Sequence, residues 1–211
     1  MGGRRIEPMT VGAEPQGLDG KSIILFDGTD WSPWHDGQGD PSDWQPQGDG
    51  SVKVGSRNAV SDRSFGDFQL HVEFLCPEIE GASGQAKANS GVYLHGRYEV
   101  QILDSYGLSP SDSRCGGIYG KAAPACNAAL PAGFWQAYDI FFRAPRLGED
   151  GAVIEKPRLT VLHNGVMIHN AIELDAPTPG GLGEDTPAKG PIMLQAHGDP
   201  VLFRNIWIRP G

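Results

Sequence analysis

The chain has 211 residues, of which 39% are hydrophobic and 20% are charged, and this composition excludes global disorder. The formal net charge of −9 repels phosphate backbones, and no basic patch interrupts it, so nucleic acid is not an expected partner. There is no run of about 18 apolar residues, so no contact with a membrane is expected. The 30 glycines and 17 prolines are typical of many short strands joined by turns.

Residues 1–20 are polar and rich in glycine and proline, which predicts a loosely ordered N-terminal arm. The start, Met1 to Arg5, is charged but no apolar segment follows it, so no signal peptide is expected in this chain. Residues 21–211 contain no linker and no internal repeat, and we expect them to form a single β-sandwich domain.

Short alternating segments follow one another along this domain. The clearest is residues 67–75, where Phe68, Leu70 and Val72 fall on one face of a strand of period two. The pair Asn164-Gly165 between two alternating runs predicts a hairpin with a type I′ turn. No window shows a helical stripe, so the pattern predicts a sandwich or jelly roll. Strands are expected at 22–26, 52–54, 58–60, 67–75, 91–94, 97–103, 136–143, 158–174 (the hairpin), 191–197 and 202–209.

The cysteines and tryptophans leave alternatives open. Cys115 and Cys126 lie in the long loop 104–133, where they could form a disulfide or remain free, and Cys76 is expected to be buried and free. The tryptophans of the segment 29–50 could stack on sugar rings or pack in the core, and for Trp207 the core is favoured.

The segment 97–104 is the main candidate for chemistry. Strand parity places Tyr98 and Val100 on one face, whereas Glu99 and Gln101 project together from the other. Carboxylates on a concave sheet are typical of sugar chemistry. Asp104 would reach the side of Glu99 only through a β-bulge. The alternative is that Glu99 and Gln101 form a solvated strand face.

Several motifs together resemble one known family, the 3-keto-disaccharide hydrolases. The motifs are Leu25-Phe-Asp-Gly-Thr-Asp-Trp31, Gly66-Asp-Phe-Gln-Leu70, Asn89-Ser-Gly-Val92, Tyr98-Glu-Val-Gln-Ile-Leu-Asp104, Gly117-Ile-Tyr-Gly120, His163-Asn-Gly165, Leu194-Gln-Ala-His-Gly-Asp199 and Phe203-Arg-Asn-Ile206. The resemblance implies an all-β, concanavalin A-like jelly roll of two curved antiparallel sheets. It also implies cleavage of 3-keto-glycosides in the periplasm or outside the cell, after a separate 3-dehydrogenase has oxidised the sugar.

A keto group at C3 acidifies the hydrogen at C2, so cleavage by elimination needs a base, a donor to the developing oxyanion and an acid. Glu99 or His197 is expected to be the base, with Asp104 as acid or orienting group. The expected substrate-binding residues are Gln101, Arg204, Tyr119, Asn89 and His95. No cofactor is expected; Asp104, Asp112 and Asp199 could bind Ca²⁺, but the spacing of a calcium loop is absent.

Two alternatives remain at this point. An ordinary glycosidase of the laminarinase type would use Glu99 and Asp104 as paired acids, although its Glu-x-Asp-x-x-Glu pattern reads Glu-x-Gln-x-x-Asp here. A non-catalytic carbohydrate-binding module would present an exposed aromatic platform in place of a polar pocket.

Overall fold

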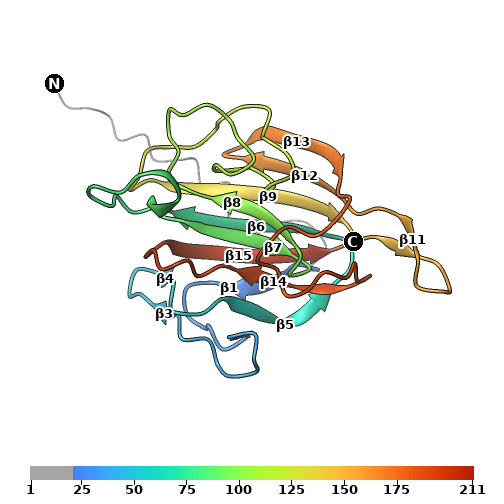
Figure 1. The fold of residues 1–211 in the computed structure, drawn as a ribbon. Helices are drawn as coiled ribbons and strands as arrows, with labels where there is room; N and C mark the ends of the chain where they lie inside the picture. The colour runs from blue at the N-terminus through green and yellow to red at the C-terminus, as the bar shows by residue number, and fades with distance from the viewer. Residues whose placement is uncertain (1–20) are drawn as a thin grey trace.

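The computed structural model describes residues 21–211, so the arm predicted for residues 1–20 lies outside the described part of the chain. Two antiparallel sheets, one of eight strands and one of five, lie face to face (Figure 1). The predicted all-β jelly-roll sandwich is therefore confirmed. Within residues 21–211 the only helical element is a 3₁₀ turn, η1 (Gly84–Ala86).

The strands of the two sheets come from distant parts of the sequence. The larger sheet has the order β13 (Val166–Glu173), β12 (Arg158–His163), β9 (Trp135–Arg143), β6 (Phe68–Leu75), β15 (Leu202–Pro210), β4 (Val52–Lys53) and β3 (Gln45–Pro46), with β1 (Ile23–Phe26) also paired to β15. The smaller sheet has the order β2 (Trp34–His35), β5 (Ala59–Phe65), β14 (Gly190–Leu194), β7 (Ser90–Leu94) and β8 (Tyr98–Ile102).

The core lies between the two sheets, where the alternating apolar residues of facing strands meet. Phe68 and Leu70 of β6 and Val100 of β8 are almost fully buried in one cluster. The hydroxyl of Tyr138, on β9, donates to the carbonyl of Gln101 at 2.7 Å and so connects the two layers. The inward face of β8 is thereby fixed, and its other face is presented outward.

The predicted hairpin at Asn164-Gly165 is confirmed, and a second tight turn joins β7 to β8. Asn164 and Gly165 have φ values of 52° and 78°, as both central residues of a type I′ turn require. His95 and Gly96, between β7 and β8, have φ values of 53° and 63°. A Cβ atom on Gly96 would also lie 2.6 Å from the terminal Cδ1 of Leu182, so a larger residue there would have to push this exposed side chain aside. This tight turn sets the register of β7 against β8.

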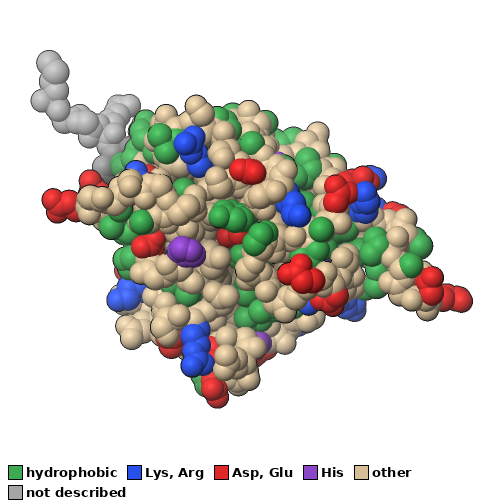
Figure 2. All heavy atoms as spheres, viewed as in Figure 1, with side chains coloured by type: hydrophobic (Ala, Val, Ile, Leu, Met, Phe, Trp, Pro, Cys, Tyr) green, Lys and Arg blue, Asp and Glu red, His purple; other side chains and the backbone are tan. Residues whose placement is uncertain are grey.

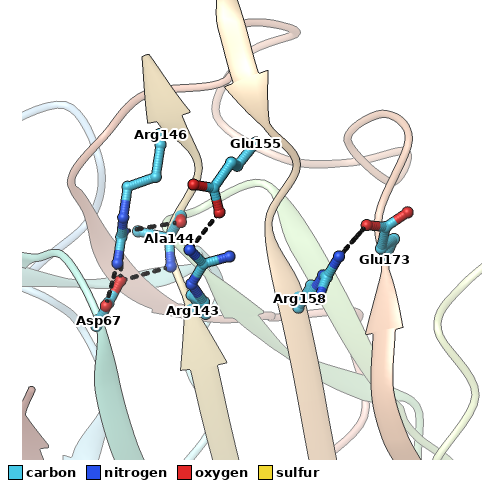
Figure 3. Close-up of polar contacts among 7 residues, drawn as sticks. All are labelled: Asp67, Arg143, Ala144, Arg146, Glu155, Arg158 and Glu173. Carbon is cyan, nitrogen blue, oxygen red and sulfur yellow. Dashed lines mark hydrogen bonds and ion pairs between the residues drawn. The ribbon is translucent and has the colours of Figure 1, made fainter.

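A small hairpin of β10 (Arg146–Leu147) and β11 (Val153–Glu155) was not predicted, because its strands are too short to alternate visibly. It projects from the body of the sandwich (Figure 1). Ion pairs connect it to the larger sheet, as Figure 3 shows: Arg146 contacts both carboxylate oxygens of Asp67, and Arg143 of β9 contacts Glu155.

The outward face of β6 differs from the expected half-buried strand. His71 and Glu73 are only 0% and 4% exposed. Burial alone would lower the pKa of His71, but hydrogen bonds to Asp139 and Glu73 outweigh it and raise this pKa to about 9. Trp207 stacks on the His71 ring with centroids 5.2 Å apart, so it is buried on this outer face and not in the main core.

The aromatic-rich segment 29–50 forms packing and not a platform. Trp31 stacks on Trp34 and on Trp44 with centroids 4.7 Å and 5.5 Å apart, and all three are buried.

The three cysteines are free. Cys115 is buried with its sulfur 3.1 Å from the Tyr138 hydroxyl, whereas Cys126 is exposed. A disulfide between Cys115 and Cys126 is therefore ruled out in this structure.

Candidate functional site

A polar pocket of about 270 Å³ opens on the outward face of the five-stranded sheet. It is built where β7, β8 and the end of β14 lie beside one another, and the loop 177–189 contributes to its wall. Ten residues line it: Gln85, Asn89, Tyr93, Glu99, Gln101, Tyr119, Pro179, Gly180, Gln195 and His197. Its floor is buried, because Asn89, Tyr93, Glu99 and Gln101 are each at most 3% exposed.

Glu99 is the one carboxylate among the lining residues of this pocket. It lies directly opposite Tyr93 in the β7–β8 register, and the Tyr93 hydroxyl donates to its Oε2 at 2.9 Å. Its Oε1 accepts no hydrogen bond from any residue in the described range 21–211. Burial raises the pKa of Glu99 to about 7, and the bond from Tyr93 offsets only part of that shift. A carboxyl group with this pKa can take up and release a proton near neutral pH.

Two glycines make room for this arrangement. A Cβ atom on Gly91, on the neighbouring strand, would lie 2.3 Å from Oε1 of Glu99. A Cβ atom on Gly180 would lie 2.8 Å from the Tyr93 hydroxyl oxygen. Any side chain at Gly91 would therefore displace the carboxyl group from its position over β7.

Tyr93 connects the floor of the pocket to its wall. Its hydroxyl lies 2.8 Å from the carbonyl oxygen of Pro179, and Gln195 Nε2 donates to it at 3.2 Å. Burial, followed by the nearby charge of Glu99, raises the pKa of Tyr93 above its ordinary value. The phenol therefore stays protonated, and it donates to the carboxylate while Glu99 is ionised.

The pocket presents acceptor oxygens. Four buried oxygens of its lining accept no hydrogen bond from residues 21–211: Asn89 Oδ1, Glu99 Oε1, Gln101 Oε1 and Gln195 Oε1. Buried acceptors without partners are costly, at roughly 1–3 kcal/mol each, unless a ligand satisfies them. A ligand rich in hydroxyl donors, such as a sugar, matches this lining.

The structure gathers five of the eight residues expected from the sequence. Glu99, Gln101, Asn89, Tyr119 and His197 all line the pocket. The first two project together from β8, as strand parity predicted, while Tyr98 and Val100 point into the core.

Asp104 is not brought to Glu99. Strand β8 pairs with β7 in unbroken register and ends at Ile102, so the bulge that would turn Asp104 toward the pocket does not form. The Asp104 carboxylate instead pairs with Lys87 Nζ at 2.8 Å, outside the pocket lining.

Arg204 and His95 also lie elsewhere. Arg204 does point away from buried Phe203, but it lies on β15 of the other sheet. Its guanidinium bonds Glu73 at 2.6 Å and lies 4.1 Å from the centre of the Trp135 ring. His95 is fully buried in its turn, with Nε2 3.1 Å from the Gly66 carbonyl oxygen. Neither side chain can hold a ligand in this pocket.

The sequence interpretation missed Gln85, Tyr93, Pro179, Gly180 and Gln195. For Tyr93 a signal was present, because Val92 and Leu94 point inward and parity sends the residue between them outward. Gln195 lay within a motif already noted for His197. Pro179 and Gly180 come from a loop and Gln85 from the 3₁₀ turn η1, where no periodicity reveals a direction.

A larger hollow, of about 540 Å³, lies on the outer face of the eight-stranded sheet around Phe141. Its arginines are already engaged: Arg143 pairs with Glu155, and Arg158 with Glu173 at 2.6 Å (Figure 3). No residue of the hollow has the combination of burial and unpaired polar atoms seen at Glu99. We therefore take the smaller pocket as the candidate site.

Residues 21–211 contain no cluster of three or more His, Cys, Asp and Glu side chains that could hold a metal ion. No helix in that range is long and apolar enough to cross a membrane. On the face shown in Figure 2, acidic and basic side chains are interspersed among hydrophobic and neutral ones.

Comparison with known proteins adds independent information. Residues 21–209 match the family model described as the 3-keto-alpha-glucoside-1,2-lyase-like domain. A candidate glycosyl hydrolase of Parabacteroides distasonis is 36% identical, with 91% of this chain and 84% of that chain covered and a TM-score of 0.83. No curated protein matches the chain.

More distant structures share the fold alone. A second candidate glycosyl hydrolase of Parabacteroides distasonis is 17% identical over 94% of this chain and 98% of that chain, with a TM-score of 0.69. An alginate lyase, Aly36B, is 10% identical over 90% and 98% of the two chains, with a TM-score of 0.50. The family match and the first neighbour together indicate a carbohydrate-active protein.

Proposed function

Because the chain belongs to the 3-keto-alpha-glucoside-1,2-lyase-like family, we propose that it cleaves the glycosidic bond of 3-keto-glycosides by elimination. One observation carries the proposal: a single buried carboxyl group, Glu99, has a pKa of about 7 and an oxygen without a protein partner among the described residues. It lies on the floor of a pocket lined by acceptors suited to hydroxyl groups.

The proposed reaction begins with proton transfer from C2 of the sugar to Glu99 Oε1. The electron pair of the broken C–H bond moves toward the 3-keto group and forms an enolate. Collapse of the enolate forms the C1–C2 double bond and expels the C1 substituent, whose oxygen takes a proton. Water can add to the unsaturated product later, which gives net hydrolysis.

Other residues of the pocket lining are assigned to the oxygens and hydroxyls of the substrate. The hydroxyl of Tyr119 is assigned to the enolate oxygen, because preorganised donors stabilise developing charge. His197 is exposed in the loop that follows β14, and it is assigned as proton donor to the leaving oxygen at the mouth of the pocket. Asn89, Gln101 and Gln195 are assigned to the sugar hydroxyls. Tyr93 is a positioning residue that orients Glu99.

Both alternative functions lack support from the geometry. A two-carboxylate glycosidase needs a second carboxyl group about 5–9.5 Å from the first. Glu99 is the one acidic residue in the pocket lining, and Asp104 is paired with Lys87. A carbohydrate-binding module needs an exposed aromatic platform, whereas Trp31 and Trp34 are buried against each other.

The setting of the reaction is also proposed. The substrate requires prior oxidation at C3, so a separate 3-dehydrogenase is expected upstream, and the periplasm or the cell exterior is the expected location. The proposed reaction uses no cofactor.

The test is to incubate the protein with a 3-keto-glucoside and, separately, with the parent glucoside, and to identify products by mass spectrometry. The proposal expects loss of the aglycone from the oxidised substrate alone, with an unsaturated or hydrated keto-sugar as co-product. Equal cleavage of the parent glucoside would show an ordinary glycosidase, and sugar binding without turnover would show a binding module. Glu99→Gln is the matched inactive control.

A further inference from the structure

A chain of side-chain amides runs along one wall of the pocket. Gln85, in the 3₁₀ turn η1, donates from Nε2 to the backbone carbonyl of Ser113 at 2.8 Å. Its Oε1 accepts from Asn89 Nδ2 at 3.1 Å and, in a longer contact, from Gln101 Nε2 at 3.4 Å. Asn89 Nδ2 also donates to the backbone carbonyl of Gln85 at 2.9 Å. Two backbone carbonyls therefore anchor the chain.

The anchors give the chain one direction. A carboxamide has a donor end and an acceptor end, and a backbone carbonyl can only accept. Ser113 therefore fixes the nitrogen of Gln85 toward itself and leaves Oε1 facing Asn89 and Gln101. Their amide nitrogens turn to that oxygen, so Asn89 Oδ1 and Gln101 Oε1 are the ends left without a partner in residues 21–211. Both lie in the pocket lining.

We infer that Gln85 is a specificity-determining residue. Its side-chain oxygen holds the carbonyl end of Gln101 toward the pocket, and the same oxygen together with its backbone carbonyl holds that of Asn89, so that this wall accepts sugar hydroxyls and disfavours a keto oxygen. The inference rests on the proposed function. A keto oxygen can only accept, so it would meet another acceptor at this wall. The 3-keto group must then face the donor Tyr119, and the hydroxyls of the same ring face the amides.

The polarity of residue 85 and its shape can be separated by substitution. Gln85→Met keeps a side chain of similar length but removes both the donor and the acceptor. Gln85→Glu keeps oxygen acceptors for Asn89 and Gln101, but it adds a negative charge and replaces the donor to the Ser113 carbonyl by a second acceptor, so this anchor is lost. If residue 85 merely supports the turn η1, the two variants should behave alike. If it fixes amide direction, the Glu variant should retain the selectivity that the Met variant loses.

The experiment measures kcat and KM for a 3-keto-glucoside and for its analogues lacking the hydroxyl at C2, C4 or C6. The wild type is expected to disfavour at least one analogue by about tenfold or more in kcat/KM, as sites built to bind a hydroxyl do. Gln85→Met should raise KM for the full substrate and reduce to within about threefold the discrimination against the analogue whose missing hydroxyl faces Gln101, because the backbone carbonyl of residue 85 still holds Asn89. Gln85→Glu should keep it. Comparing ratios between variants cancels any intrinsic effect of a missing hydroxyl on the chemistry.

Gln47→Met is the matched control, because Gln47 is part-exposed, far from the pocket lining, and bonds only within its own turn. It should leave every ratio unchanged, and thermal melting should show that all variants fold. Unchanged discrimination in Gln85→Met, with a wild type that is active and selective, overturns the inference and leaves the proposed function intact. Equal loss in the Met and Glu variants also overturns it. A wild type without turnover of any 3-keto-glucoside overturns the proposed function and the inference with it.

Discussion

Replacing Glu99 by glutamine should make the protein more stable at pH 8 while it removes activity. In the folded protein burial raises the pKa of Glu99 from 4.5 to about 7, so the folded state binds this proton more tightly than the unfolded state. Between pH 4.5 and about 7 the unfolded chain releases the proton first, and stability falls as the pH rises. Glutamine fits the same space, accepts the bond from Tyr93 and never ionises.

The size of the effect follows from the same shift. A rise from 4.5 to about 7, at about 1.4 kcal/mol per pH unit, corresponds to at most about 3.5 kcal/mol. Part of it is offset because the new amide nitrogen also needs a partner in a buried position. We therefore expect Glu99→Gln to gain about 1–3 kcal/mol at pH 8 and to lose up to about 2 kcal/mol at pH 4, where Glu99 is protonated in both states and only the cost of the amide remains.

Urea denaturation at several pH values between 4 and 8 measures this directly, with the slope m checked to be equal in both proteins. Glu78→Gln is the matched control, since Glu78 is exposed; its effect should stay within about 0.5 kcal/mol at every pH. Turnover of the 3-keto-glucoside should fall about a hundredfold or more, as expected for loss of a general base.

Two results would refute this reasoning. If Glu99→Gln were less stable than the wild type at pH 8, burial of the ionised carboxylate would carry no cost. If the difference in stability were the same at pH 4 and pH 8, ionisation of Glu99 would not be its source.

Three further predictions concern neighbouring groups. Tyr93→Phe removes the bond that lowers the pKa of Glu99, so the acid limb of the kcat/KM profile should move to higher pH; an unmoved limb would contradict it. Gly91→Ala places a Cβ 2.3 Å from the present position of Glu99 Oε1 and should lower kcat at least about tenfold in the same turnover assay, whereas an unchanged kcat would count against this geometry. His71 has a folded pKa of about 9 against 6.5, raised against burial by Asp139 and Glu73, so its stabilising effect is complete below pH 6.5 and is lost as the pH rises through 9. His71→Gln should therefore flatten urea stability between these pH values, and an unaltered slope would argue against the ion pairs.

Much of the site could be predicted because a strand has only two faces. Once Tyr98 and Val100 are apolar and inward, Glu99 and Gln101 must share the outward face. The Asn164-Gly165 hairpin could be predicted for an equally local reason, since its turn needs two positive φ values.

The misplaced residues depended on information that parity does not contain. Parity correctly turned Arg204 away from Phe203 but could not tell that β15 belongs to the other sheet, where Glu73 lies opposite. Asp104 follows the last paired residue of β8, so alternation no longer fixes its direction, and Lys87 decides it. Tyr93 and Gln85 became part of the site through register and loop packing, which only the folded chain specifies.

The hydroxyl of Tyr93 has one proton but two acceptors within reach, Glu99 Oε2 at 2.9 Å and Pro179 O at 2.8 Å. An ionised carboxylate is the stronger acceptor, so while Glu99 is charged the Tyr93 hydroxyl donates to Glu99, and the Pro179 carbonyl receives no hydrogen bond from it. When Glu99 holds a proton, it no longer needs the phenol, and Tyr93 can turn its proton to the loop. Protonation of Glu99 thus allows the hydrogen bond from Tyr93 to Pro179 to form, and ionisation of Glu99 breaks it. Rotation of one O–H bond therefore couples the charge of Glu99 to the segment 177–189.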